Sequence, residues 1–356
     1  MNKLDKLLDG RKNILITGGA GFIGGSLIRR LLKESSSHIY NLDKFGYASD
    51  DSSINDLILR DKSLENRYKS IKVDLSNSEN TFDAIRISDP DLIIHLAAES
   101  HVDNSISDAL PFIQSNIVGT YNILEASKNH FQNLNNKRKG KFRFHHVSTD
   151  EVFGSLNDKD YFNEETNYDP KSPYSASKAS SDHLVRAWGH TYKIPIIITN
   201  CSNNFGPWQF PEKLIPLAIT RALENKIIPI YGDGKNIRDW LFVEDHINAL
   251  ILAGNNGSIG ESYCIGGYGE KSNLEIINCI CEILDELFPS NYPHNKLIKF
   301  VKDRPGHDIR YAINPEKIMR ELGWQPKYDL KSALRHTVNW YIKNKNWWLP
   351  KIIKNN

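Results

Sequence analysis

Apolar residues in the first 200 positions alternate between short continuous runs and stretches with helical spacing. The first run, Asn13–Thr17, leads into a glycine-rich turn, after which Leu27, Ile28, Leu31 and Leu32 recur on one helix face. This order predicts a strand, a tight turn and a helix.

Further short apolar runs have the length and composition of buried strands. They are residues 39–43, 71–73, 92–96, 142–148 and 194–199. Each run is separated from the next by a region long enough for a helix. Because strands that alternate with helices form parallel sheets covered on both faces, we predict an α/β protein with a Rossmann-type doubly wound parallel sheet.

The pattern changes after Asn200. Prolines interrupt the chain at positions 207, 211, 216 and 229, and glycines cluster at 232 and 234. Residues 240–243 are predicted to form a return strand and residues 244–254 a helix that rejoins the first region. We therefore expect a smaller, interleaved C-terminal α/β region.

Composition limits the function classes. The chain has 356 residues and a formal net charge of +2, which is too balanced to predict nucleic-acid binding. No window approaches the roughly 18 to 20 apolar residues of a membrane span, and no leader is apparent, so we expect a cytoplasmic protein. In the C-terminal tail, Trp347 and Trp348 lie among lysines. A terminal helix that docks its aromatic residues on the core is favoured over a membrane-surface contact.

Cysteine and histidine spacing does not indicate a metal site. The four cysteines lack C-x-x-C spacing and are expected to be reduced; they are Cys201, Cys264, Cys279 and Cys281. His95, His145 and His146 lie in buried-strand patterns, where packing and hydrogen bonding are their expected roles. We predict no metal.

The glycine-rich turn has the spacing G-x-x-G-x-x-G at Gly18, Gly21 and Gly24. Residues without Cβ allow a tight turn and a close approach to a pyrophosphate, which the N-terminus of the next helix then faces. Asp43, about 20 residues further on, can accept both adenosine ribose hydroxyls and would repel a 2′-phosphate, so NAD is favoured over NADP. Asp74 follows another strand and either reaches the adenine or caps a helix.

Tyr174 and Lys178 are four residues apart on one face of a predicted helix. An ammonium group there is expected to lower the phenol pKa from its usual value of about 10 and to hold the nicotinamide ribose. The Y-x-x-x-K pattern alone is common. Its position after the glycine motif and after strand 142–148 favours the short-chain dehydrogenase/reductase superfamily.

Thr149, Asp150 and Glu151 follow strand 142–148, at the sheet edge where ligands of such folds bind. Two neighbouring carboxyl groups in a cleft titrate as a coupled pair, one favoured as acid and the other as base. They predict a second proton transfer beside an alcohol oxidation; exposed loop acids are the alternative. Thr149 either binds the reacting hydroxyl or caps the following turn.

Basic residues of the second region suit a diphosphate group. Arg238 and Arg304 lie in loops that contain glycine or proline, and Lys213 lies upstream. Guanidinium groups bind phosphates in bidentate fashion, although ordinary salt bridges remain the alternative.

From about residue 13 to residue 340 the chain resembles the dTDP-glucose 4,6-dehydratases, nucleotide-sugar enzymes of the extended short-chain dehydrogenase/reductase class. The motifs that carry the resemblance are ITGGAGFIG from Ile16, LAAESHVD from Leu96, STDEVFG from Ser148, YSASK from Tyr174, CSNNFGPWQFPEKLIP from Cys201, YGDGKNIRDW from Tyr231 and DRPGHDIRYAI from Asp303. The Thr-Asp-Glu triplet and the last three segments are the most specific to this family.

The resemblance implies a reaction in three stages. Tyr174 would remove the C4 hydroxyl proton while hydride passes to a tightly bound NAD. Glu151 would take the C5 proton while Asp150 protonates the departing C6 hydroxyl. Hydride would then return to C6, so NAD is recycled and the product is a 4-keto-6-deoxy sugar nucleotide. Thr149 would orient the sugar, and Lys178 would assist Tyr174. The family is typically homodimeric, and a homodimer is expected here.

The resemblance also implies contacts. Those to the cofactor are Gly18, Gly21, Phe22, Ile23, Gly24, Asp43, Asp74, Leu75, Ala97, Ala98, Tyr174 and Lys178. Those to the substrate are Ser100, Asn203, Lys213, Leu214, Tyr231, Arg238, Asn273, Arg304 and His307. Residues 1–200, with a return segment at about 240–270, would bind NAD. Residues 201–239 and 271–340 would bind the sugar nucleotide, and 341–356 form the tail.

Other functions share parts of this pattern. A related sugar-nucleotide 4,6-dehydratase, a decarboxylase or a 4-epimerase acting on a UDP- or GDP-sugar would keep the glycines, Asp43 and the Tyr/Lys pair. An epimerase or decarboxylase would not need an acid and a base at Asp150 and Glu151. A catalytically silent nucleotide-binding module would have no reason to keep all four groups together.

Overall fold

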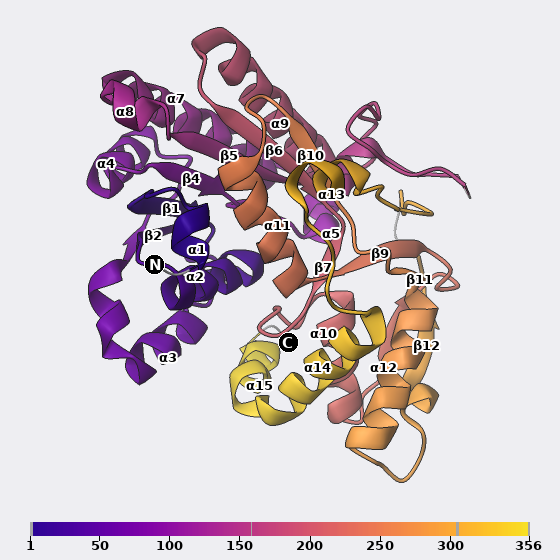
Figure 1. Cartoon of the computed structure of the whole chain (residues 1–356). Helices are drawn as coiled ribbons and strands as arrows, with labels where there is room; N and C mark the ends of the chain where they lie inside the picture. Colours follow the sequence, from indigo (N-terminus) through magenta and orange to yellow (C-terminus); the bar gives the residue numbers. More distant parts are fainter. Residues whose placement is uncertain (1–2, 158, 304–305, 355–356) are drawn as a thin grey trace.

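A seven-stranded parallel sheet forms the centre of the computed structural model, which describes residues 3–157, 159–303 and 306–354 (Figure 1). The strand order is β10-β6-β5-β4-β1-β2-β3. The strands are β1 (Asn13–Thr17), β2 (His38–Asp43), β3 (Tyr68–Lys72), β4 (Leu92–His95), β5 (Arg143–Thr149), β6 (Ile196–Cys201) and β10 (Ser262–Ile265). Every neighbouring pair is parallel, which confirms the predicted doubly wound sheet.

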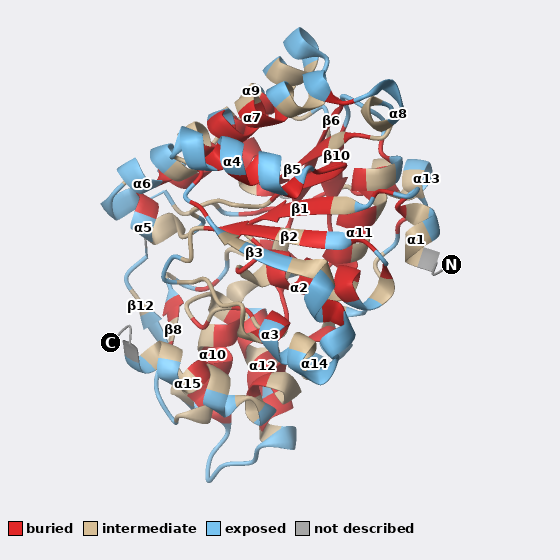
Figure 2. Cartoon of the chain, turned by 90° about the vertical axis from the view of Figure 1, so that its left-hand side faces the viewer, coloured by how far each residue is buried: buried red, intermediate tan, exposed pale blue. Residues whose placement is uncertain are grey.

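Helices cover both faces of this sheet. On β1, Ile14 and Ile16 pack into one apolar cluster with Leu27 of α2, while Leu15 points to a second cluster that contains Ile123. The strands are correspondingly buried along most of their length, except for the edge strand β3, whose residues are intermediate or exposed (Figure 2). The long helices of this region are α2 (Phe22–Glu34), α3 (Ser52–Arg60), α4 (Ser78–Ser88), α7 (Gly119–Asn133), α9 (Pro173–Tyr192) and α11 (Val243–Asn256).

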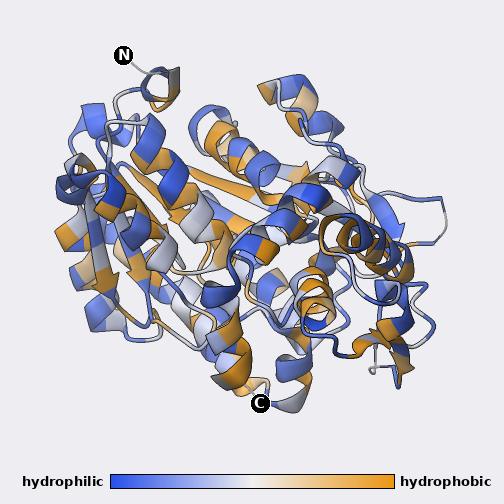
Figure 3. Cartoon of the chain, turned by 90° about the horizontal axis from the view of Figure 1, so that it is seen from below, coloured by the Kyte–Doolittle hydropathy of each residue, from blue (hydrophilic) through white to orange (hydrophobic). Residues whose placement is uncertain are grey.

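Short helical elements complete the connections. They are α1 (Lys3–Leu7), η1 (Lys62–Arg67), α5 (Val102–Ser107), α6 (Leu110–Phe112), the π-helix η2 (Ile113–Val118), α8 (Asn136–Lys139), η3 (Asp150–Phe153) and η4 (His294–Leu297). Seen from below, the strands are apolar while the helices carry hydrophilic outer faces (Figure 3). No helix in the described ranges has the length and apolar character needed to cross a membrane.

The second region contains two small sheets. One has the order β11-β9-β7 and the other pairs β12 with β8. The strands are β7 (Asn203–Phe205), β8 (Ile228–Tyr231), β9 (Ile237–Phe242), β11 (Glu270–Ser272) and β12 (Ile298–Val301), and the helices are α10 (Leu214–Leu223), α12 (Asn273–Leu287), α14 (Leu330–Lys343) and α15 (Lys345–Lys354). Helix α13 (Glu316–Leu322) packs instead against α11 and β10 of the first region.

The predicted return of the chain was wrong in one respect. The strand expected at residues 240–243 is the end of β9, which pairs with β7 and β11 and not with the central sheet. The chain instead re-enters the first region through α11 and then β10, which pairs with β6. Local hydrophobicity reveals a strand but not the sheet that it joins, because pairing is decided by distant partners.

The C-terminal aromatic residues dock on the core, as expected. Trp348 is fully buried, and its indole N–H donates to the carbonyl of Tyr341 at 2.8 Å. Burial of one large aromatic side chain of this kind stabilises the fold by roughly 2 to 3 kcal/mol. Helix α15 is thereby fixed beside α14.

Candidate active site

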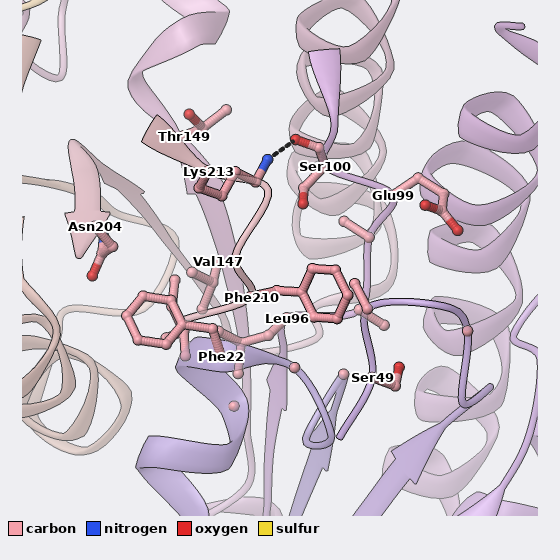
Figure 4. Close-up of a pocket in the computed structure, with 18 of the residues that line it drawn as sticks. Phe22, Ser49, Leu96, Glu99, Ser100, Val147, Thr149, Asn204, Phe210 and Lys213 are labelled. Atoms are coloured by element: carbon pink, nitrogen blue, oxygen red, sulfur yellow. Dashed lines mark hydrogen bonds between the residues drawn. The ribbon is translucent and has the colours of Figure 1, made fainter. Parts of the chain in front are cut away.

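A cavity of about 410 Å³ opens at the carboxyl ends of the central strands. Gly18 follows β1, Asp43 ends β2, Thr149 ends β5 and Asn203 follows β6, and all four line it. In Figure 4, Thr149 and Lys213 lie on one side of the cavity, and Phe22 and Ser49 lie on the other. Parallel strands bring these positions together because their carboxyl ends share one edge of the sheet.

The glycine turn between β1 and α2 has no room for side chains. Gly18 has a φ of +71°, and a Cβ there would lie 2.8 Å from the backbone nitrogen of Ala97. A Cβ on Gly24 would lie 2.3 Å from the carbonyl oxygen of Gly18. Gly21 caps the N-terminus of α2, whose first residues line the cavity. The turn therefore presents backbone N–H groups to an anionic ligand such as a pyrophosphate.

Asp43 is held in one orientation at the end of β2. Its carboxylate accepts hydrogen bonds from the backbone nitrogens of Ala20, at 3.0 Å, and Phe45, at 2.8 Å, and from the Ser49 hydroxyl at 2.9 Å. Asp74 lines the same cavity and accepts from the backbone nitrogen of Ser76. Helix α4 is capped by Asn77, so the helix-cap alternative for Asp74 is wrong.

These features suit a dinucleotide. Every residue expected to contact the cofactor, from Gly18 to Lys178, lines this one cavity. The turn that a Cβ would fill and the fixed carboxylate of Asp43 match a pyrophosphate and an adenosine ribose. Several lining residues were not predicted from the sequence, among them Lys44, Tyr47, Ala48, Ser49, Phe210 and Glu212. Those between residues 44 and 49 directly follow Asp43, and this proximity could have indicated them.

Tyr174 and Lys178 both lie on α9 and are both buried. The helix begins with a capping box between Ser172 and Ser175, which sets the direction of its first turn. The Lys178 ammonium donates to the carbonyl of Val147 on β5 at 2.9 Å. This bond fixes the ammonium group at the edge of the sheet.

The expected lowering of the Tyr174 pKa was wrong in direction. Burial, followed by the negative charge of Glu151, raises the pKa of Tyr174 well above its usual value. Burial also lowers the pKa of Lys178, against the opposing charge of Asp182. A dry cleft disfavours the phenolate until a positive charge is near it. The spacing of Tyr174 and Lys178 in the sequence could not predict these pKa shifts, because burial depends on the whole fold.

Asp150 and Glu151 begin η3 directly after β5. Asp150 is 1% exposed, and its Oδ2 atom has no hydrogen-bond partner within the described parts of the chain. Burial, then the charges of Glu151 and Asp239, raise the pKa of Asp150 well above its usual value, and Arg238 opposes them. The site therefore favours a protonated Asp150, as general acid catalysis requires.

Thr149 caps the turn that follows β5, and its contact with a reacting hydroxyl stays a prediction. Its hydroxyl accepts from the backbone nitrogen of Glu151 at 3.3 Å and thereby caps η3. The same hydroxyl donates to Oδ1 of Asp150 at 3.3 Å, and it lines the cavity. Thr149 thus fixes the backbone that carries both carboxyl groups.

A buried polar network connects α9, the helix that carries Tyr174 and Lys178, to the central sheet. Asp182, one turn after Lys178, accepts hydrogen bonds from the Ser148 hydroxyl and from the Tyr168 hydroxyl, both at 2.8 Å, and pairs with His146. Burial by itself raises the pKa of Asp182, but His146 and Lys178 lower it overall. Asp182 was not predicted, because its partners lie on other elements.

The histidines have the structural roles that were expected. His95 pairs with the Thr17 hydroxyl at 2.7 Å, and His145 pairs with the Thr199 hydroxyl at 2.9 Å. Burial lowers the pKa of His146 to about 4, so it is neutral at pH 7. Among the residues that the structure describes, no three His, Cys, Asp or Glu side chains are grouped to hold a metal ion.

The expected substrate residues divide into two groups. Ser100, Asn203, Lys213 and Leu214 line the cavity, and Lys213 donates to the Ser100 carbonyl at 2.9 Å (Figure 4). The others are not in its lining: Tyr231, Arg238, Asn273 and His307. Arg304 lies outside the described residues.

Two residues of the second group, Arg238 and Tyr231, interact with residues of the first region. Arg238 is buried, stacks over Tyr311 at 4.2 Å and donates to the carbonyl of Asp308. Its charge lowers the pKa of Asp150, against burial. The Tyr231 hydroxyl donates to Asp103 at 3.4 Å, so β8 of the second region contacts α5 of the first.

Known proteins resemble this chain along nearly its whole length. A family model described as GDP-mannose 4,6 dehydratase matches residues 15–337. The dTDP-glucose 4,6-dehydratase of Shigella flexneri is 50% identical over 343 residues, covering 94% of each chain. That of Haemophilus influenzae is 52% identical over 340 residues, covering 93% of this chain and 98% of that protein.

The fold comparison agrees with the sequence comparison. The dTDP-glucose 4,6-dehydratase of Streptomyces venezuelae, solved with NAD and TYD bound, has a TM-score of 0.85 at 38% identity, covering 95% of this chain and 99% of that one. Relatives that are half identical over nearly the full length, together with this structural match, show that the chain belongs to the dTDP-glucose 4,6-dehydratases.

Proposed function

We propose that the chain converts dTDP-glucose to dTDP-4-keto-6-deoxyglucose in an NAD-dependent reaction. The observation that carries the proposal is the buried Oδ2 atom of Asp150, which has no hydrogen-bond partner among the described residues and lies next to Glu151, in the same cavity as Tyr174 and Lys178. Alcohol oxidation needs the Tyr/Lys pair, whereas loss of water also needs an acid and a base. The relatives named above carry the matching activity in their names.

The first proton transfer belongs to Tyr174. When bound, NAD accepts a hydride from C4 of the sugar and later returns it to C6. The Tyr174 phenolate, stabilised by the Lys178 ammonium that the Val147 carbonyl holds, accepts the proton of the C4 hydroxyl and becomes the neutral phenol. Burial makes this stabilisation necessary, because it raises the Tyr174 pKa.

Asp150 and Glu151 perform the elimination. The ketone at C4 acidifies the C5–H bond, and Glu151 removes that proton. The C5 electron pair forms the C5–C6 double bond while Asp150 gives its proton to the C6 hydroxyl, which leaves as water. After hydride reaches C6, Glu151 returns the proton to C5. The raised pKa of Asp150 keeps its proton available for the departing hydroxyl.

The two regions of the chain divide the ligands between them. We assign NAD to residues 1–200 with the return segment at about 240–270, and the sugar nucleotide to residues 201–239 and 271–340. Lys213 supports this assignment, because it lines the cavity from the second region. Arg238, Tyr231, His307 and Asn273 are assigned to the sugar nucleotide by family resemblance.

Assembly and location follow from the same proposal. Exposed apolar side chains on α5, α6, η2 and α7 support a homodimer; they are Ile106, Leu110, Ile113 and Tyr121. Such side chains gather at contacts between subunits more often than on free surfaces. We place the enzyme in the cytoplasm, where its four free thiols would stay reduced.

Incubation of the purified protein with dTDP-, UDP-, GDP- and CDP-glucose tests the function. We expect a 4-keto-6-deoxy product from dTDP-glucose, without net reduction of NAD. Turnover of UDP-glucose alone would overturn the thymidine assignment. Inversion at C4 without loss of water would instead identify a 4-epimerase, the second candidate.

A further inference from the structure

Helix α15 contacts the loop that follows Asp43, far from it in sequence. In this loop, residues 44–51, the side chain of Asp50 accepts a hydrogen bond from the Trp347 indole at 2.6 Å. The same oxygen atom forms an ion pair with Lys351 at 2.6 Å. The Lys351 ammonium also lies 4.7 Å from the centre of the Trp347 ring. The C-terminal helix thus holds one carboxylate with two neighbouring groups.

Asp50 connects these contacts to the cofactor side of the cavity. Its backbone nitrogen donates to the Ala20 carbonyl in the glycine turn at 2.7 Å. The preceding residue, Ser49, donates to Asp43 at 2.9 Å, and Asp43 in turn accepts from the Ala20 nitrogen. The loop is therefore held between the glycine turn on one side and α15 on the other.

Aromatic packing joins the same helix to the wall of the cavity. The Trp208 ring lies 4.8 Å from that of Trp340 and 5.2 Å from that of Trp347, and Arg29 of α2 lies 5.6 Å above it. A small second cavity lies among these groups, and Phe22, Ala48 and Phe210 line both cavities. Only a thin layer of residues therefore separates α15 from the cofactor cavity.

We propose that Trp347 and Lys351 act as a C-terminal latch that keeps the 44–51 loop closed over the adenosine half of NAD and slows its release. The latch rests on the proposed function, since it takes NAD as the ligand of the cavity. An enzyme that uses the same cofactor for both hydride transfers gains from slow release, because a lost NADH would leave the 4-keto intermediate without its hydride donor. Asp50 is a positioning residue in this scheme.

The position of α15 would allow the contacts of Trp347 and Lys351 with Asp50 to break and re-form. Figure 1 shows α15 beside α14 at the end of the chain, and Trp348 anchors it to Tyr341. The latch side chains remain partly accessible, with Lys351 22% and Asp50 19% exposed. Loss of the two polar contacts would therefore release the side of the loop that faces α15, while Trp348 stays in the core and the contacts to the glycine turn remain.

The test compares NAD release from three proteins. Trp347→Phe/Lys351→Met keeps a ring and an aliphatic stem but removes both donors. Lys345→Met is the matched control, because Lys345 lies on the same helix and pairs with Glu224, the residue that follows α10, at 2.5 Å. Each protein is loaded with radiolabelled NAD and chased with unlabelled NAD, and the retained label is followed by rapid gel filtration.

We expect release from the double variant to be about tenfold faster, with the effect mainly in the dissociation rate. Lys345→Met should match the unaltered protein. The KM for NAD should rise in the double variant while kcat at saturating NAD stays near its original value, a split that a general loss of structure would not give. Thermal unfolding measured without NAD should change little.

The outcomes separate the two proposals. Unchanged release from the double variant, with NAD bound by the unaltered protein, overturns the latch alone. Bound NAD and faster release without any 4-keto product overturn the proposed function alone. Failure of the unaltered protein to bind NAD overturns both.

Discussion

The Asp182 carboxylate pairs with Nε2 of His146 at 3.0 Å, and both side chains are fully buried. Asp182→Asn would leave buried donors facing an amide and remove the negative charge nearest Lys178 on α9. We expect the free energy of unfolding to fall by about 3 kcal/mol. Because the folded-state pKa of Asp182 is lowered, its stabilisation is present above about pH 4 and is lost as the pH falls through the lowered value.

Denaturant unfolding of Asp182→Asn at pH 7 measures this loss. Asp83→Asn is the control, since Asp83 forms an exposed ion pair with Arg86 that should contribute at most about 1 kcal/mol. Equal stability of the two variants would contradict a supporting role for the Asp182 network.

Glu151→Gln should stop the elimination while the first oxidation continues. The amide cannot remove the C5 proton, so we expect dehydration and solvent-deuterium exchange at C5 to fall by about 10²- to 10⁴-fold. NAD binding should persist. Mass spectrometry of the product in D₂O provides the measurement, and undiminished C5 exchange would remove Glu151 from the role of base.

Asp150→Asn should slow loss of water more than oxidation at C4, because the amide has no proton to give to the departing hydroxyl. In the unaltered enzyme, dehydration should decline as the pH rises through the raised pKa of Asp150. This alkaline decline should disappear in the variant. Equal loss of both steps in single-turnover experiments would contradict the role of acid.

The same substitution should improve stability at neutral pH. A carboxyl group whose folded-state pKa is raised contributes stability below its unfolded pKa of about 4, and this contribution is lost as the pH rises through the folded value. Because asparagine does not ionise, Asp150→Asn removes this loss of stability at higher pH. Denaturant unfolding at pH 5 and pH 8 should show a smaller difference for the variant than for the unaltered protein.

Asp43→Asn should weaken NAD binding by about tenfold or more, because a charged acceptor for the ribose hydroxyls is lost. Discrimination against NADP should weaken as well, since the charge that repels a 2′-phosphate is absent. Calorimetric titration with both cofactors gives the two affinities. Asp56→Asn, on the exposed face of α3, should bind NAD normally.

Gly24→Ala should disrupt the glycine turn, since its Cβ would lie 2.3 Å from the Gly18 carbonyl. We expect a loss of about 2 kcal/mol in stability together with weaker NAD binding. Gly25→Ala is the matched control: its nearest contact is 3.4 Å, and alanine is the better helix former. Similar behaviour of both variants would show that the turn tolerates a side chain.

The sequence predicted those parts of the site that depend on short-range patterns. Gly18 and Asp150 each follow a strand, and Asp43 ends one; the apolar runs of these strands are visible locally, and parallel strands bring their ends together. The support of Lys178 by Asp182 could not be predicted, because His146 and Tyr168 come from other elements. The direction of the Tyr174 pKa shift depends on burial, which no spacing encodes.

The second region was predicted less completely for a related reason. Strands β10 and β12 have four residues each, and their partners are distant in sequence. Tyr47 and Phe210 line the cavity from loops without regular hydrophobic spacing. Such residues gain their positions from tertiary contacts, which a single sequence does not display.

The last three residues of strand β5 have different tasks: the Val147 carbonyl binds Lys178, Ser148 binds Asp182, and Thr149 holds the two carboxyl groups. A slip of one residue in the pairing of β5 would reverse the faces of all of these positions at once. The groups for oxidation and for dehydration therefore depend on one and the same strand register. A change of reaction type is open to this scaffold through replacement of side chains at Asp150 and Glu151, but not through movement of the strand that bears them.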